Sequence, residues 1–285
     1  MKRRSAFANS PAGPLPSSSR RFAKGVSLAF LILLVAIGVA GKAYFTHQLA
    51  ESRQQAEDQL WAVASLKVRQ IVDWREERRS AAQTIMRDLF LAERVGKFLA
   101  GSKGGEMRSA MLARLKSIQE HNQALRTVLL DPQLNVRLTF PEDKTYFGPI
   151  AQTYAVAALR AGQVVFSDLH RSQFTGDIHL DLVVPLSLPR APEPTAASAA
   201  QHVGVIVIEV DPSRFLYPRI SDWPTSSRTA ETVLVRREGN EVLYLNDLRH
   251  RSNTAMSFRL PVDSTRRLPA TMAAMGQEGN EGVKQ

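Results

Sequence analysis

Acidic and imidazole side chains are concentrated in one short part of the sequence. The run Asp168–Arg171 is followed after five residues by Asp177–Asp181, and the two runs together contain two histidines. Residues two apart in a β-strand share a face, so Asp177, His179 and Asp181 are expected on one side of a strand. The apolar residues between them would then pack on the other side. This spacing predicts a polar strand face that could do chemistry.

Three interpretations of this face remain open. A strand face in contact with water is the simplest and carries no function. A face that borders a small cavity would suit a ligand with ammonium, carboxylate or hydroxyl groups. The candidate ligand contacts are Tyr146, Asp168, His170, His179 and Asp181. Imidazole and carboxylate groups also suit several divalent ions, but the sequence fixes no coordination geometry, so no metal ligand and no cofactor is assigned.

Other site chemistries lack their motifs. The sequence has no Gly-x-Ser-x-Gly elbow, and its His/Asp pairs have no evident serine partner. The glycines and lysine of residues 101–105 do not continue into the Gly-Lys-Ser/Thr of a phosphate loop. The absence of cysteine excludes disulfides, thiolate metal sites and cysteine nucleophiles. We therefore expect that this chain is not an enzyme.

The elements that must position these residues begin with an apolar run near the N-terminus. Gly25–Gly41 contains no charged residue and leads into Tyr44 and Phe45, a pair suited to a membrane interface. Residues 25–45 are therefore predicted to form a transmembrane helix. A signal peptide cleaved near Gly41, where small residues gather, is the alternative.

The charge distribution predicts the topology of this helix. The net charge is +10, but the basic residues are spread along the chain, and six of them precede the apolar run. The first acidic residue is Glu51. This asymmetry predicts a cytoplasmic, disordered basic tail at residues 1–24 and an extracytoplasmic main domain, and it does not favour nucleic acid as a partner.

A long helix is predicted to continue from the membrane. Neither proline nor glycine occurs from Thr46 to about Ala92, and charged residues such as Lys67 are expected on wet faces. We assign residues 46–100 to this stalk helix, whose helical part is on the order of 70 Å long. Its apolar residues recur at steps of three, four or seven: Leu60, Ala64, Ile71, Trp74, Ala81, Ile85 and Leu89.

Two groups of short strands follow, at residues 101–222 and 223–285. The first group has a helix up to about residue 124, a hairpin turning at 132–135, a helix at 150–161, and strands at 163–168, 178–186 and 202–210. The second has strands at 232–236, 241–245 and 255–260, then a short helix at 268–275. This order predicts an α+β fold in which antiparallel sheets carry helices gathered on one side.

The order of elements resembles that of double Cache domains, the extracytoplasmic sensors of bacterial membrane receptors, in which two PAS-like lobes are attached to one long helix. Leu129–Asn135 is similar to the first hairpin of that family, Val164–Asp168 and His179–Pro185 to its paired pocket strands, and Gly204–Pro212 to the last strand of its first lobe. The most specific match is Trp223–His250, which is similar to the start of the second lobe.

The resemblance covers about residues 49–282 and has several implications. It implies that residues 101–222 form a membrane-distal lobe that binds a small molecule, and that residues 223–285 form an incomplete membrane-proximal lobe. It implies a signal relayed through the stalk, a homodimer formed by parallel stalks, and location in the bacterial inner membrane. The Tyr/Arg/Trp/Tyr/Asp signature of the amino-acid-binding members is not found, so an amino-acid ligand is not implied.

Such receptors normally cross the membrane a second time and end in a PAS, histidine kinase or diguanylate cyclase module. No later apolar run and no such motif occur in these 285 residues, so we expect a truncated receptor. The leading hypothesis is a ligand-sensing and signal-transducing region. The alternatives are the sensor fragment of a receptor enzyme whose catalytic part is absent, and a secreted binding protein released by signal cleavage.

Overall fold

The structure, a computed structural model, describes residues 17–101, 105–142, 146–189, 201–224, 227, 229–262 and 268–277. The predicted tail before residue 17 and most of the two predicted loops at 101–105 and 189–200 lie outside these residues. The chain divides into two compact units, Met1–Trp61 and Ala62–Gln285.

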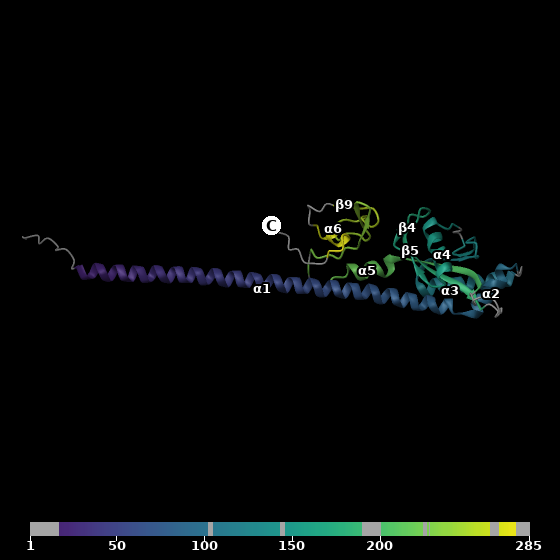
Figure 1. Cartoon of the computed structure of the whole chain (residues 1–285), viewed down its shortest axis with the longest axis horizontal. Coiled ribbons are helices and arrows are strands. Elements are labelled where there is room, and N and C mark those ends of the chain that lie inside the picture. The colour runs from purple at the N-terminus through teal and green to yellow at the C-terminus, as the bar shows by residue number, and fades with distance from the viewer. Residues whose placement is uncertain are drawn as a thin grey trace, which may run out of the picture. The chain divides into compact units, whose positions relative to one another are not determined.

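The described part of the first unit is a continuous helix. It belongs to α1 (Ser17–Met86), which is the helix near the N-terminus in Figure 1. An 18-residue window of α1 has a mean hydropathy of 2.3, and none of it is buried against protein. Within the described residues, α1 is long and apolar enough to cross a membrane, as the run Gly25–Gly41 predicted.

The predicted stalk helix is interrupted near its end. Helix α1 stops at Met86, and α2 (Leu89–Leu99) begins after two intervening residues. Asp88 is the N-cap of α2, and its Oδ1 accepts a hydrogen bond from the Leu91 amide at 3.0 Å. The expectation of one helix through about Ala92 is therefore wrong, because Asp88 starts a new helix by satisfying a free amide at its N-terminus.

The part of α1 in the second unit buries one stripe of side chains. Trp74 and Ile85 are buried as the helical period predicted. Leu60, Ala64 and Leu89 belong to the same predicted stripe but are exposed. Lys67 was expected on a wet face but is only 5% exposed. Its Nζ donates to the carbonyl oxygens of Arg219, at 2.5 Å, and Asp222. A cation is stable there because the last carbonyls of a helix, here α5 (Leu216–Ser221), lack helical partners.

A six-stranded antiparallel sheet forms the larger core. Its order is β2-β1-β6-β5-β3, and β4 also pairs with β5. The predicted hairpin and the two long strands are confirmed, while β3 is shorter than expected. The strands are β1 (Ala124–Leu130), β2 (Val136–Phe140), β3 (Val165–Phe166), β4 (His170–Arg171), β5 (Ile178–Leu188) and β6 (Gln201–Val210).

Helices cover both faces of this sheet, which corrects the expectation that they gather on one side (Figure 1). Residues of α1, α2 and α3 (Gly105–Asn122) pack on the face that carries Leu182 and Ile208. Helix α4 (Pro149–Ala161) packs on the opposite face, against Val183 and Val207. The reason is that β5 and β6 are apolar at consecutive positions, so both of their faces must be covered.

A second, three-stranded sheet follows, as predicted, and it also lies in the second unit. The α+β fold class with two antiparallel sheets is therefore confirmed. Within the second unit, hydrogen bonds join the part with the six-stranded sheet to the part with the three-stranded sheet. Arg171 donates to the Ala255 carbonyl at 3.0 Å, and Arg236 donates to the Leu169 carbonyl at 2.8 Å. The elements that follow β6 in the chain are the 3₁₀ helix η1 (Pro212–Arg214), α5, β7 (Val235–Glu238), β8 (Glu241–Tyr244), β9 (Arg259–Pro261) and α6 (Pro269–Ala274).

Candidate functional site

Strand β5 places His179 and Asp181 on the face that α4 covers, and β4 adds a second histidine. His170 is opposite His179 in the antiparallel register of β4 and β5. The exposed fractions of His170, His179 and Asp181 are 9%, 5% and 0%. His179 and Asp181 therefore share a strand face, as predicted, but this face is buried. Of the three residues predicted on it, only Asp177 is exposed to water.

A buried ion pair lies beside these residues on the same face. Glu209 of β6 is opposite both Arg126 of β1 and Asp181 of β5, so the three side chains form one row across the sheet. Arg126 donates from Nε to Glu209 Oε2 at 3.0 Å, makes a second bond to Oε1, and donates to the Tyr146 carbonyl at 2.8 Å. We did not predict this ion pair from the sequence, although a single charged residue within each of two apolar strands indicates that such a pair exists.

A small cavity opens next to this row. Its volume is about 60 Å³, which is room for roughly four water molecules or one small polar group. His170 and His179 line it together with Arg126 and Glu209. Residues 148–151, where α4 begins, and residues 171–173 form further parts of the wall.

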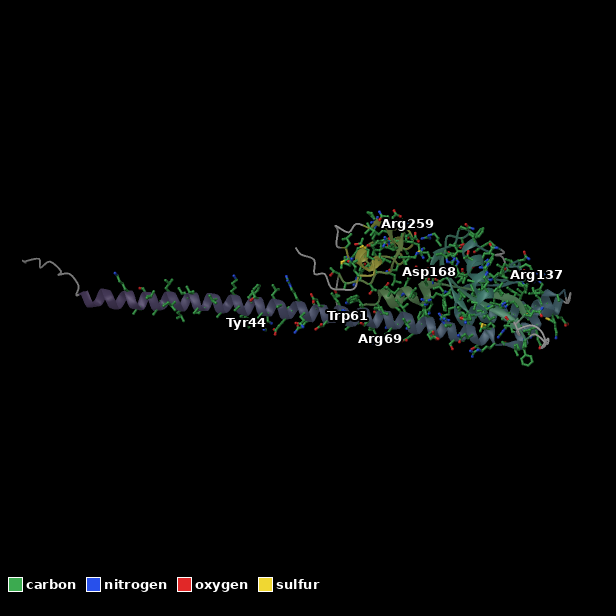
Figure 2. The ribbon with its side chains drawn as sticks, in the orientation of Figure 1. Tyr44, Trp61, Arg69, Arg137, Asp168 and Arg259 are labelled. Carbon is green, nitrogen blue, oxygen red and sulfur yellow. The ribbon has the colours of Figure 1, made fainter. Side chains whose placement is uncertain are left out.

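The aromatic side of the cavity is formed by Tyr146 and Phe174. Their rings stack with centroids 4.7 Å apart, and the Arg126 guanidinium lies 4.1 Å from the Tyr146 centroid. Tyr146 thus lines the cavity, as do the two predicted histidines. Asp168 is exposed (Figure 2) and does not line it, but its carbonyl oxygen holds the His170 ring.

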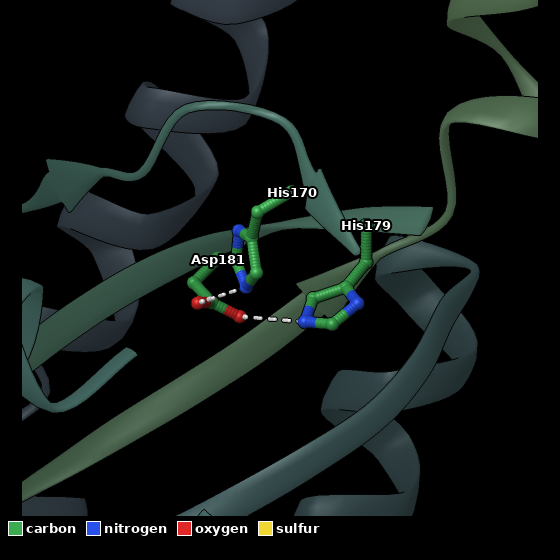
Figure 3. Close-up of side chains that lie close together, drawn as sticks. All are labelled: His170, His179 and Asp181. Atoms are coloured by element: carbon green, nitrogen blue, oxygen red, sulfur yellow. Dashed lines mark ion pairs between the residues drawn. The ribbon is translucent and has the colours of Figure 1, made fainter. Parts of the chain in front are cut away.

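The hydrogen bonds of the two imidazoles fix which ring nitrogen faces Asp181. Nδ1 of His170 lies 3.0 Å from the Asp168 carbonyl oxygen, and Nδ1 of His179 lies 3.4 Å from that of Asp177. A carbonyl oxygen can only accept, so each Nδ1 carries the hydrogen. In the neutral rings each Nε2 then presents a lone pair. Figure 3 shows both Nε2 atoms directed at Asp181, at 3.5 Å from Oδ2 for His170 and 3.7 Å from Oδ1 for His179.

The Asp181 carboxyl is buried without a hydrogen-bond partner for either oxygen among the described residues. Burial raises its pKa to about 8, the Glu209 charge adds to the rise, and Arg126 opposes it. Burial also lowers the pKa of His179, against the opposing effect of Glu209. Arg126 is paired with Glu209, and no lysine or arginine among the described residues forms an ion pair with Asp181. Binding of a proton or of a cation would therefore stabilise the cluster of His170, His179 and Asp181.

No family model matches the chain, and no curated protein matches it. Among solved structures, the chain is similar to the sensor domain of the V. cholerae histidine kinase DctB, with 16% identity and a TM-score of 0.45 over 60% of each chain. It is similar to the sensory domain of the Campylobacter jejuni chemoreceptor Tlp3 with isoleucine bound, with 12% identity and a TM-score of 0.40 over 57% of this chain and 61% of that one.

A further similar structure is the ligand-binding domain of the Pseudomonas aeruginosa PAO1 chemoreceptor PctB with L-Arg, with 16% identity and a TM-score of 0.42 over 72% of this chain and 75% of that one. The match to the DctB sensor spans 60% of that chain's length. These structures are sensor or ligand-binding domains of a histidine kinase and of chemoreceptors.

Proposed function

We propose that this chain is the extracytoplasmic ligand-sensing and signal-transducing region of a bacterial inner-membrane receptor, with its N-terminus in the cytoplasm. The observation that carries the proposal is the cavity on the α4 face, where aromatic and ionisable side chains converge. A helix able to cross a membrane belongs to the same chain. In this proposal residues 101–222 form the membrane-distal, ligand-binding lobe and residues 223–285 part of the proximal one. The intact receptor carries a histidine kinase or diguanylate cyclase as output.

The cavity favours a small ligand with a positively charged group. The Arg126–Glu209 pair is neutral as a unit. The raised pKa of Asp181 means that this residue gives up its proton, and adds a negative charge to the row, when a cation binds beside it. A volume of about 60 Å³ admits one small group, so the rest of a larger ligand would extend out of the cavity. Ammonium compounds, including amino acids and polyamines, are therefore the first class to examine.

The signal would reach α1 through the end of β6. Glu209 of the site is followed directly by η1 and α5, and the last carbonyls of α5 accept hydrogen bonds from Lys67 of α1. A ligand changes the position of α1 only if it binds two arrangements of this connection with different affinities. Lys67 is one residue of α1 through which such a difference would pass.

Ligand binding can be tested on the full chain in lipid nanodiscs with EDTA present. Amino acids, polyamines and organic acids are added singly, and thermal unfolding is followed. A ligand at 100 times its Kd stabilises by about 2.7 kcal/mol, which raises Tm by several degrees. Phe174→Ala should abolish the shift, because Phe174 lines the cavity. Phe90→Ala is the matched control, since Phe90 is an exposed phenylalanine of α2 that does not line the cavity.

Two results would contradict the proposal. One is the absence of any shift in a protein that unfolds cooperatively. The other is an equal shift in the Phe174→Ala and Phe90→Ala variants, which would place binding outside the cavity.

We further propose that two chains associate through α1 as a homodimer. Val68 and Val72, one helical turn apart, are 60% and 57% exposed, although neighbouring turns of the helix bury apolar residues such as Trp74. Two exposed β-branched residues at this spacing fit a seam between parallel helices.

The dimer is tested by the mass of the detergent-solubilised chain, measured by light scattering after size exclusion. We expect Val68→Glu to convert the dimer into a monomer. Arg69→Glu introduces the same side chain beside the seam, with a charge change of two units instead of one, and should leave the dimer intact. A wild-type monomer at micromolar concentration, or a Val68→Glu dimer, would refute the assignment.

A further inference from the structure

The grouping of His170, His179 and Asp181 goes beyond what ligand sensing requires. One possible ligand atom from each residue lies within 4.8 Å of the others, and all three residues are buried. The chain has only six histidines, and two of them meet at this point. We propose that these three side chains bind a divalent transition-metal ion, for which Zn²⁺ is the natural probe.

The first argument comes from the outer hydrogen bonds of the two imidazoles. Histidines that bind metals almost always donate their second ring N–H to a carboxylate, a carbonyl oxygen or water, which fixes the ring and leaves the other nitrogen free for the metal. Both rings have this arrangement, through the carbonyl oxygens of Asp168 and Asp177. The two strands β4 and β5 therefore hold both Nε2 atoms ready before any ion arrives.

The second argument comes from the distances. At 3.5 and 3.7 Å, the Nε2–oxygen pairs are too long for good hydrogen bonds. Zinc binds nitrogen and carboxylate oxygen at about 2.0–2.2 Å, so its tetrahedral ligand atoms are roughly 3.3–3.6 Å apart. The two histidine–aspartate separations are close to this spacing, although each involves a different oxygen of Asp181, and the three ligand atoms lie within 4.8 Å of one another. Binding would draw the side chains closer together around one ion.

The third argument comes from the burial and the types of the three groups. Asp181 is 0% exposed, and neither of its carboxyl oxygens has a hydrogen-bond partner among the described residues. A divalent ion satisfies all three groups at once, and two imidazoles with one carboxylate are ligands that suit Zn²⁺, Fe²⁺ and Ni²⁺.

The ion also has a route to the site. We expect an ion to enter through the cavity, because His170 and His179 line it; Asp181, which their Nε2 atoms face, is not among the lining residues. Three protein ligands leave at least one coordination position for water or for a ligand atom. The metal-site proposal does not depend on whether an organic molecule also occupies the cavity.

Metal binding is measured on the full chain in nanodiscs after removal of any affinity tag and of bound metal with chelator. We expect one Zn²⁺ per chain by calorimetry and by elemental analysis after dialysis. Asp181→Asn and His170→Ala should each weaken binding by about 100-fold or more. His202→Ala is the matched control, because His202 lies on β6 of the same sheet and its Nδ1 contacts Ser187 Oγ at 2.8 Å instead. It should bind Zn²⁺ like the wild type.

A spectroscopic measurement on the wild type covers the case in which a variant does not fold. Co²⁺ in a site of low coordination number gives strong visible absorption, which Zn²⁺ then removes by competition. A wild-type chain that binds less than 0.1 equivalent of Zn²⁺ at about 100 μM free metal and shows no such Co²⁺ spectrum overturns the proposal. Equal Zn²⁺ affinity in folded Asp181→Asn, His170→Ala and His202→Ala variants overturns it as well. Both readouts are independent of the organic-ligand screen, which contains EDTA.

Discussion

Arg126→Met is expected to lower the free energy of unfolding by about 3–5 kcal/mol, because it leaves the Glu209 carboxylate buried without its cation. Arg126 is 1% exposed and bonds to both oxygens of Glu209. The Tyr146 carbonyl would lose its donor as well. Chemical unfolding of the detergent-solubilised chain with EDTA present, followed by tryptophan fluorescence, measures the loss.

The double variant Arg126→Met/Glu209→Leu is the decisive comparison. Replacing both members of a buried ion pair by apolar residues of similar volume is often neutral or stabilising, whereas removing one member is costly. We therefore expect the double variant to regain most of the stability lost by Arg126→Met. If the double variant is as unstable as the single one, the cost comes from lost packing around Arg126 and the row of charges has a smaller role.

The two variants also separate stability from function. Arg126 and Glu209 line the cavity, so the double variant would be stable but would lack the charged wall beside His179. Ligand binding that survives in this variant would place the recognition groups at the histidines and aromatic rings instead. The ion pair would then act mainly by fixing the position of Tyr146, through its carbonyl and its ring.

Local patterns in the sequence were enough to predict most elements and part of the site. The hairpin at residues 132–135 and the end of the helix predicted at 150–161 depend on turn residues that act within a few positions. Strand alternation correctly placed His179 and Asp181 on one face, because the side chains of a strand point alternately to its two faces. Helix boundaries were less certain, and the cap at Asp88 was not recognised.

The missed contacts join residues far apart in the sequence. Glu209 lies 83 positions from Arg126, and the carbonyls that bind Lys67 lie 152 and 155 positions away. Such pairs depend on strand register and helix docking, which no local period encodes. A charged residue inside an apolar strand or stripe does indicate that a partner exists, since an unpaired buried charge is too costly, but it does not say which residue the partner is.

The packing of α1 on the connection between the two sheets makes Trp74 the other position with a large expected effect. Trp74 is 3% exposed, and its ring stacks on Phe215, which lies between η1 and α5, at 5.7 Å between centroids. Trp74→Ala removes this contact from the core and should lower the free energy of unfolding by about 3–5 kcal/mol. Thermal and chemical unfolding of the full chain measure the change.

Trp74→Phe is the matched control because the indole N–H has no hydrogen-bond partner among the described residues. Phenylalanine keeps an aromatic ring against Phe215 and removes a buried, unsatisfied donor, which costs about 1–3 kcal/mol in general. That gain offsets the smaller ring, so the stability of Trp74→Phe should stay within about 1 kcal/mol of the wild type. A loss in Trp74→Phe as large as that in Trp74→Ala would show that the indole N–H is satisfied after all. If neither variant loses stability, α1 contributes little at this point, and a signal could not pass from η1 and α5 to α1 through Trp74.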